Sequence, residues 1–179
     1  MRLVLHLLRR EASDVVAFAH ALQELVDKVQ RCRVCHNISD NELCPICSDS
    51  HRDHSIVCVV EDVQDVIAFE ATQQFNGIYH VLGGIISPIE GIGPQDLEID
   101  SLVKRLQEEH IAEVILALSP TMEGDTTCYY IYRRIQALQD TITLPTITTL
   151  ARGVAQNDQL QYTDEFTLGR SLLERRPFR

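Results

Sequence analysis

The stretch Cys32–Cys47 reads CRVCHNISDNELCPIC, which is two C-x2-C pairs separated by eight residues. Each pair brings two sulfurs to one side of a tight turn, and four thiolates form the tetrahedral ligand set that suits zinc. The doubled spacing is a specific signal, whereas a single pair is a weak one. We therefore predict a zinc ribbon whose ligands are Cys32, Cys35, Cys44 and Cys47.

Four cysteines leave no open position on the ion, so we expect the zinc to be structural rather than catalytic. One alternative is four ordinary buried cysteines or two disulfides, which the doubled spacing disfavours. Another is a site of three cysteines and one histidine, because His36, His51 and His54 lie nearby. We rank it below the all-cysteine site, since four cysteines already complete a tetrahedron.

The composition is that of a soluble globular protein of one or two domains, with 179 residues, 45% apolar and 23% charged. No apolar run approaches the about 20 residues that span a bilayer, so we expect no membrane partner. The opening MRLVLHLLRR is too short and too charged for a signal peptide. Thiols kept as metal ligands indicate a reducing compartment, which favours a cytoplasmic location.

The formal net charge of −10 is concentrated in the middle of the chain. Residues 56–150 hold 4 Lys and Arg against 14 Asp and Glu, while both ends are slightly basic. An acidic middle repels a phosphate backbone unless a metal or a local basic patch intervenes. The equally weighted alternative is that these charges only solvate the surface.

Apolar spacing predicts helices over residues 2–30, the second one capped by Ser13, and then an alternation of strands and helices over 56–150. The expected strands are 56–61, 78–82, 113–118 and 144–150, and the expected helices are 62–75, a segment with Leu102, Val103 and Leu106 inward, and 125–138. This alternation indicates an α/β fold with a parallel sheet and helices on both of its faces.

Ligands of such sheets bind beyond the carboxyl ends of the strands. Glu61 lies at one such end, and Glu123 and Asp125 follow another, so the three carboxylates could together hold Mg²⁺. Capping of helix N-termini by acids is the alternative for the residues near helix starts. The Gly- and Pro-rich segment 83–96 is long enough for a functional loop but lacks the spacing and lysine of a phosphate-binding loop.

The two ends of the chain carry further candidates. Arg2, Arg9 and Arg10 give the first helix positive charge and are candidate DNA contacts, although a solvated helix face is the favoured alternative. In the tail we expect a hairpin over 151–166 and a short helix over 168–173. Its ending, RRPFR, lacks an obvious place within the domain, so we expect the tail to pack on a neighbouring subunit.

The order of motifs resembles the RecR family of bacterial recombination mediators over nearly the whole chain. The resemblance rests on the four-cysteine ribbon and then on HRD, IVCVVE, HVLGG, SPIEGIGP, EVILALSPTMEGDTT and YTDEFTLGRSLL. It implies a helical segment at 1–31, a zinc ribbon at 32–55, a Toprim domain at 56–150 and a C-terminal arm for oligomer contacts at 151–179.

The resemblance also implies a role in recombinational repair of gapped DNA. Members of the family act with RecO, and in many organisms with RecF, to load recombinase on single strands coated by binding protein. They assemble into homodimers and ring-like homotetramers that encircle DNA.

The chain departs from the family pattern at both ends. The family opens with a helix-hairpin-helix that holds phosphate, and this sequence matches from the second helix of that motif, which predicts weak DNA binding for this form. In the tail, Asn157 and Asp158 stand where the family has a pair of glycines. Both residue types tolerate left-handed backbone, so the turn should survive.

The resemblance bears on catalysis as well. Catalytic Toprim domains carry an Asp-Pro-Asp whose aspartates hold a metal, and here Ser119 and Thr121 replace both. We therefore predict a non-enzymatic protein with no bound Mg²⁺, in which the acidic residues Glu61, Glu123 and Asp125 remain as a vestigial site or partner surface. The alternatives are a Mg²⁺-dependent Toprim enzyme acting on nucleic acid and a bare zinc-ribbon interaction module.

Overall fold

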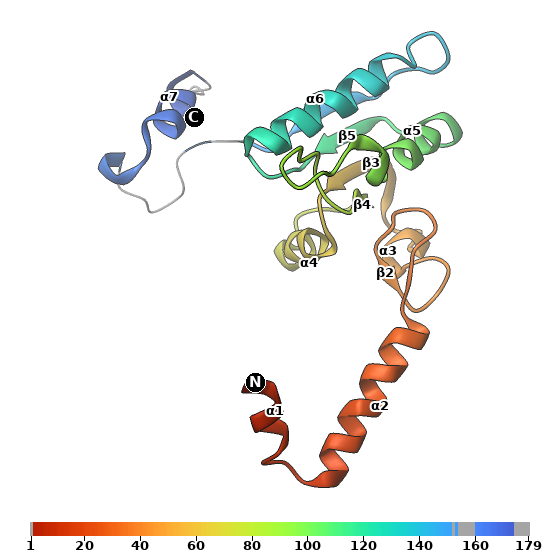
Figure 1. Ribbon diagram of the computed structural model, residues 1–179. Helices are drawn as coiled ribbons and strands as arrows, with labels where there is room; N and C mark the ends of the chain where they lie inside the picture. The colour runs from red at the N-terminus through yellow and green to blue at the C-terminus, as the bar shows by residue number, and fades with distance from the viewer. Residues whose placement is uncertain (1, 152, 154–159, 174–179) are drawn as a thin grey trace.

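The computed structural model describes residues 2–151, 153 and 160–173, and Figure 1 traces them from the N-terminal helices to the C-terminal helix. The chain begins with α1 (Arg2–Leu7) and α2 (Ala12–Lys28), which lead into a small ribbon and then a larger α/β part. Within the described ranges, no helix combines the length and apolar character that a membrane crossing needs.

The two N-terminal helices follow the predicted spacing, but α2 begins differently from our expectation. Glu11, and not Ser13, is its N-cap residue, and the side chain of Glu11 makes no capping hydrogen bond. The helix starts at Ala12, so Ser13 is its second residue and lies inside the first turn. None of the residues of α2 is buried in this single chain.

The ribbon consists of two short antiparallel strands and one helical turn. These elements are β1 (Gln30–Arg31), β2 (Ile38–Ser39) and α3 (Pro45–Ser48). Its core is built from three buried cysteines, with Val34, Leu43, Ile46 and Cys47 packed around them. A core this small depends on a further crosslink for its stability, as small metal-binding domains do.

The larger part is a four-stranded sheet with the order β4-β3-β5-β6, and all neighbouring strands are parallel. Its strands are β3 (Asp53–Val60), β4 (Gly77–Val81), β5 (Glu113–Leu116) and β6 (Thr146–Thr149). The predicted parallel sheet is therefore confirmed. Strand β3 starts at Asp53, three residues before the predicted Ile56, because Asp53 pairs with Gly77 across an irregularity in the register.

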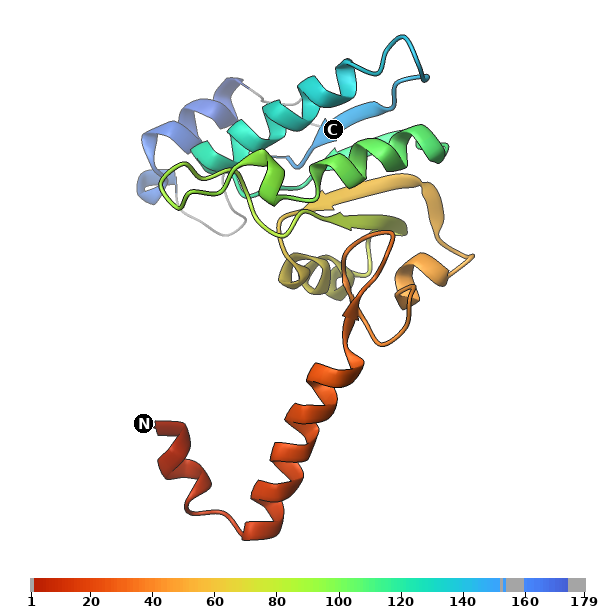
Figure 2. The same cartoon turned by 45° about the vertical axis from the view of Figure 1, so that its right-hand side comes forward.

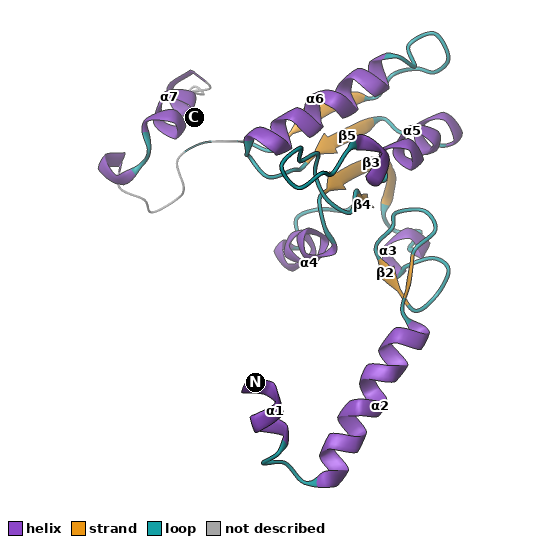
Figure 3. Cartoon of the chain, viewed as in Figure 1, coloured by secondary structure: helices purple, strands orange, loops and turns teal. Residues whose placement is uncertain are grey.

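Helices cover both faces of the sheet, as the sequence predicted (Figure 2). One face carries α4 (Val63–Thr72), whose Val66 packs with Cys58, Val60 and Tyr79. The opposite face carries α5 (Ile99–Glu108) and α6 (Met122–Gln136), whose buried Leu102, Leu106, Ile131 and Ile135 join the main core. Secondary structure is coloured by type in Figure 3.

Residues 83–96 form the long connection that the sequence predicted. Gly83, Gly84 and Gly91 have positive φ, and an isolated bridge pairs Ser87 with Ile92 before the short 3-10 helix η1 (Pro94–Asp96). The loop is held to the main core by its isoleucines and to α6 by a bond from Ile86 N to Thr127 Oγ1 of 2.9 Å.

The C-terminal part contains the 3-10 helix η2 (Leu160–Tyr162) and α7 (Glu165–Leu173). The predicted tail helix is confirmed and begins three residues earlier than expected. The turn of the predicted hairpin, with Asn157 and Asp158, lies outside the described residues, as does the ending RRPFR. Residues 160–162, which the hairpin prediction included, are 3-10 helix rather than strand.

Candidate metal centre and acidic edge of the sheet

The four predicted zinc ligands meet in the ribbon. The sulfurs of Cys32, Cys35, Cys44 and Cys47 all lie within 4.8 Å of one another, and they form the one group of three or more potential ligands found among the described residues. No disulfide joins Cys32, Cys35, Cys44 or Cys47, so the alternative of two disulfides does not hold. The donor set is four soft sulfurs in a compact cluster, which fits zinc in a closed tetrahedral site.

Backbone amides around the cluster donate hydrogen bonds to the cysteine sulfurs. Cys44 N donates to Cys32 Sγ at 3.3 Å, and Cys47 N donates to Cys44 Sγ at 3.4 Å. The first of the two knuckles closes with a bond from His36 N to Cys32 O, and Pro45 starts the helical turn α3 of the second. Hydrogen bonds donated to sulfur favour its anionic form, which is the form that binds a metal.

Four thiols at this distance cannot all ionise without a cation. The hydrogen bond with Cys35 lowers the pKa of Cys44, and the bond with Cys44 raises the pKa of Cys35 to about 12. The pKa of Cys47 is also raised, first by its hydrogen bond with Cys35. A divalent cation removes this competition, because its charge stabilises every thiolate that it contacts.

The three neighbouring histidines do not join the cluster. The ring of His51 is 92% exposed and contacts Asp49, with 3.0 Å between Nδ1 and Oδ1. His54 places Nε2 2.9 Å from the carbonyl oxygen of Asp49. His36 turns away from the sulfurs toward the sheet, where its ring meets His80 edge-on at 5.2 Å between centroids.

The acidic candidates lie at the carboxyl edge of the sheet but do not converge on one point. Ser119 Oγ donates to Glu61 Oε2 at 3.3 Å, which joins the ends of β5 and β3. Glu123 and Asp125 lie in the first turn of α6. Among the described residues, the three carboxylates do not form a group near enough to share an ion. The structure therefore does not assemble the predicted three-carboxylate set.

The segment between β5 and α6 is held in a tight turn. Thr121 is the N-cap of α6, and its Oγ1 accepts a hydrogen bond from Gly124 N at 3.1 Å. An ideal Cβ on Gly124 would lie 2.0 Å from Ser119 O, so only glycine fits at this position. The hydroxyls of Ser119 and Thr121 therefore both have partners within the fold.

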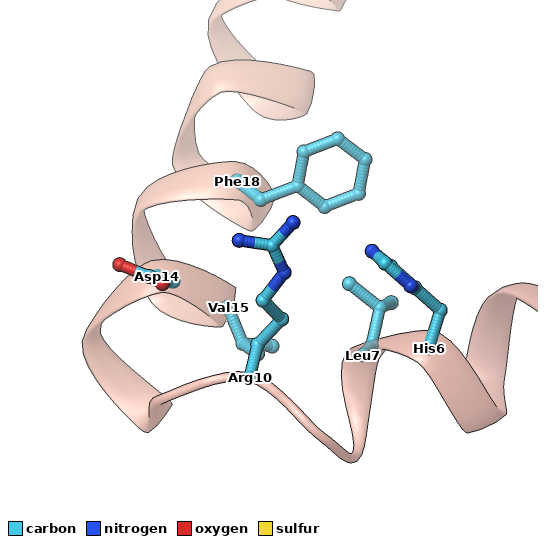
Figure 4. Close-up of a pocket in the computed structure, with 6 residues that line it drawn as sticks. All are labelled: His6, Leu7, Arg10, Asp14, Val15 and Phe18. Carbon is cyan, nitrogen blue, oxygen red and sulfur yellow. The ribbon is translucent and has the colours of Figure 1, made fainter.

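The N-terminal arginines lie apart from both sites. Arg2 is in α1, and Arg9 and Arg10 are in the turn that follows it, with exposed side chains. Arg10 lines a pocket between α1 and α2 of about 430 Å³ together with His6, Leu7, Asp14, Val15 and Phe18. In Figure 4 the guanidinium of Arg10 lies near the Phe18 ring and opposite His6, whereas Asp14 points away.

Sequence reasoning missed a set of residues along the free edge of β4. Arg105 is 5% exposed and donates from Nη1 to Tyr79 O at 2.9 Å. Arg52 donates to Gly77 O at 3.0 Å and also pairs with Glu70, which accepts from Tyr79 Oη. The sequence did contain a signal for Arg105, because this arginine directly precedes Leu106, which the apolar pattern placed on the inward face of a helix.

Comparison with known proteins matches both folded parts. The four-cysteine zinc finger domain of RecR matches residues 29–49, and the Toprim domain family matches residues 55–145. The recombination protein RecR of Bacteroides fragilis is 57% identical over 178 residues, which cover 99% of this chain and 84% of that protein. Those of Porphyromonas gingivalis and Flavobacterium johnsoniae are 52% and 51% identical, with the same shares of the two chains. The resemblance expected from the motifs is thus confirmed, and the chain belongs to the RecR family of recombination proteins.

Proposed function

We propose that the chain is a non-enzymatic mediator of recombinational DNA repair in the cytoplasm. In this role it acts with RecO, and with RecF where that protein is present, to load recombinase on gapped or single-stranded DNA. It does so as a homodimer or a homotetrameric ring. The support is the membership in the RecR family together with a zinc-finger match and a Toprim match in one chain.

The single observation that carries the non-enzymatic role is the state of the turn from Ser119 to Gly124. Metal-dependent Toprim chemistry needs a cluster of carboxylates that stabilises charge on a phosphoryl group. Here the Ser119 hydroxyl donates a hydrogen bond to Glu61, and the Thr121 hydroxyl caps α6 by accepting from Gly124 N. Hydroxyls are neutral and are poorer ligands for Mg²⁺ than carboxylates. Glu61, Glu123 and Asp125 therefore suit a surface that binds a partner better than a site that holds Mg²⁺.

We also propose that Cys32, Cys35, Cys44 and Cys47 hold one zinc ion per chain. The ion would crosslink the two knuckles and give the ribbon the stability that its small core lacks. It would have no open position for a substrate, so its role is structural. The compact sulfur cluster and the zinc-finger match support this assignment.

We also propose the N-terminal arginines Arg2, Arg9 and Arg10 as the DNA contacts of this chain. Their side chains are exposed and lie outside the segment 56–150, which carries 14 acidic residues against 4 basic ones. Phosphate contacts supply most of the non-specific affinity for DNA, so a basic element set apart from an acidic one is where the backbone is expected to bind.

Incubation of the zinc-loaded chain with labelled DNA tests the non-enzymatic role. Duplex, gapped, nicked and single-stranded DNA are each incubated with Mg²⁺ or Mn²⁺, with and without RecO, and their lengths and topology are measured. We expect no cleavage, ligation, relaxation or primer synthesis. Metal-dependent turnover that Glu61→Ala abolishes would instead establish the Toprim enzyme as the function.

A further inference from the structure

The outward-facing backbone groups of β4 form hydrogen bonds with groups from three different parts of the chain. In the order β4-β3-β5-β6 this strand pairs on one side only, so alternate backbone groups point away from the sheet. Gly77 O accepts from Arg52 at 3.0 Å, and Tyr79 O accepts from Arg105 at 2.9 Å. The third outward position is Val81, whose N–H donates to Cys35 O at 2.8 Å.

The last of these contacts comes from the metal knuckle itself. Cys35 is one of the four clustered cysteines, so its carbonyl is fixed where the knuckle is fixed. Ile46, which lies in α3 between Cys44 and Cys47, packs against the ribbon core and against the clusters on both faces of the sheet. The ribbon is thus docked on the edge of β4 by a backbone hydrogen bond and by an apolar contact.

His36 extends this contact to the α5 face of the sheet. It has φ of 61°, a left-handed conformation that disfavours residues other than glycine. In this conformation its ring meets His80 at 73° between ring planes, and its Nε2 lies 3.6 Å from Glu98 Oε2. The left-handed backbone at His36 closes the knuckle, with His36 N donating to Cys32 O, and it leaves the ring on the side of the sheet.

His80 in turn contacts Glu98, which follows the long loop 83–96. It is completely buried, and burial lowers its pKa to about 3, so the ring is neutral. Its Nε2 lies 2.8 Å from Glu98 O, which requires the proton on Nε2 because a carbonyl only accepts. Glu98 N in turn donates to Leu82 O, and Gly83 N donates to Glu61 O, so both ends of the loop 83–96 are tied to this region.

We infer that His36 is a positioning residue that couples metal occupancy of the ribbon to the edge of β4 and to the loop 83–96. With the four sulfurs held by an ion, Cys35 and His36 keep Val81, His80 and Glu98 in place. Without the ion the knuckle loosens, the Val81 amide loses its acceptor, and the loop loses one of its supports. The sheet interior keeps its own hydrogen bonds and both of its cores.

This inference rests on the zinc site proposed above, and one pair of neighbouring amides tests it separately. Val81 N bonds to the ribbon, whereas Leu82 N bonds to Val60 O inside the sheet at 2.9 Å. Amide hydrogen exchange of the full chain is measured by NMR with one equivalent of zinc and with excess chelator. Loss of one hydrogen bond should speed exchange at Val81 by about tenfold, with Leu82 changed less than about twofold.

Variants identify the residue that carries the coupling. His36→Gly fits the left-handed backbone and removes the ring, so it should bind zinc with the wild-type stoichiometry. Its Glu98 amide, which donates to Leu82 O, should exchange faster even with zinc bound, because the ring contacts His80 and Glu98. His51→Gly is the matched control, because this ribbon histidine is 92% exposed and its ring contacts Asp49 rather than the sheet. We expect it to exchange as the wild type does.

Metal content is measured by mass spectrometry on the same samples, so failure of the zinc assignment shows as an absence of metal. The coupling itself is contradicted by either of two results. One is a wild-type Val81 amide whose exchange is unchanged by chelator or rises only together with Leu82. The other is a His36→Gly chain that exchanges like the wild type.

Discussion

Gly124 approaches Ser119 so closely that a methyl group cannot fit between them. The ideal Cβ of an alanine at 124 would lie 2.0 Å from the backbone oxygen of Ser119, and that oxygen belongs to the main chain, which cannot rotate away. The turn also directs Thr121 Oγ1 to Gly124 N. The segment 119–124 between β5 and α6 is thus a closely packed helix start.

Gly124→Ala should therefore destabilise the chain, although alanine is the better helix former. Overpacking costs about 1–3 kcal/mol, which urea unfolding of the zinc-loaded protein would measure. Gly169→Ala is the matched control, because Gly169 also lies in a helix. Among the described residues, no heavy atom other than its chain neighbours and its own helix backbone lies within 4 Å of the added methyl. That change should be neutral or stabilise by up to about 1 kcal/mol. Equal effects of the two substitutions would contradict the close packing of this turn.

The Arg52–Glu70 pair should make stability depend on pH. The hydrogen bond from Arg52 holds the pKa of Glu70 below its ordinary value of 4.5. A carboxyl with a lowered folded-state pKa stabilises fully above the unfolded value and loses that contribution as pH falls through the folded value. Glu70→Gln should therefore lower the free energy of unfolding by about 1–2 kcal/mol at pH 7, and the gap should close below pH 4.5.

Glu108→Gln serves as the control for this measurement. Glu108 pairs with Lys104 on the surface, where the two side chains are 64% and 72% exposed, and such pairs contribute little. A gap between wild type and Glu70→Gln that stays constant from pH 7 to pH 3 would show that charge on Glu70 is not what stabilises the network.

The zinc site should be lost with any one of its ligands. Cys44→Ser should reduce bound zinc from about one per chain to a small fraction and lower the yield of soluble protein, because the ribbon core is made of the ligands themselves. Cys128→Ser is the control, since Cys128 lies in α6 outside the ribbon. Mass spectrometry of reduced protein gives the metal content. Full zinc content in Cys44→Ser would remove this residue from the ligand set.

Replacing Arg2, Arg9 and Arg10 together with alanine should weaken DNA binding and flatten its salt dependence. Each lost phosphate contact reduces the slope of log K against log salt by about 0.9, so the triple variant should lose up to about 2.7. Titration of gapped duplex at several salt concentrations provides the slope. Lys104→Ala on α5 is the control, and it should keep the wild-type slope. An unchanged slope in the triple variant would place the phosphate contacts elsewhere.

The features that the sequence predicted are those that depend on local spacing. The cysteines of each pair are three residues apart, so their convergence follows from the geometry of a turn. Strand and helix alternation predicted the parallel sheet, because each element has its own apolar pattern. Element ends were less predictable: β3 begins at Asp53 because it pairs with Gly77, and α2 begins at Ala12 rather than after Ser13.

The contacts that the sequence did not predict join residues far apart in the chain. His36 and His80 are separated by β2, the second knuckle, β3 and α4, and no pattern in the sequence around either residue indicates that their rings meet. Arg105 reaches Tyr79 only because the fold brings α5 next to the edge strand β4. Strand ends indicated that Glu61, Glu123 and Asp125 lie at the same edge of the sheet, yet they could not show that the three carboxylates do not form one group.

The most direct test of the mediator role is recombinase loading on gapped DNA coated with single-strand-binding protein. Filament formation is followed by the DNA-dependent ATPase of the recombinase, with RecO present and the zinc-loaded chain added or omitted, and DNA integrity is checked after the reaction. We predict a higher loading rate in the presence of the chain, with every DNA strand intact. An unchanged loading rate, or DNA that is cut in proportion to the chain added, would contradict the mediator role.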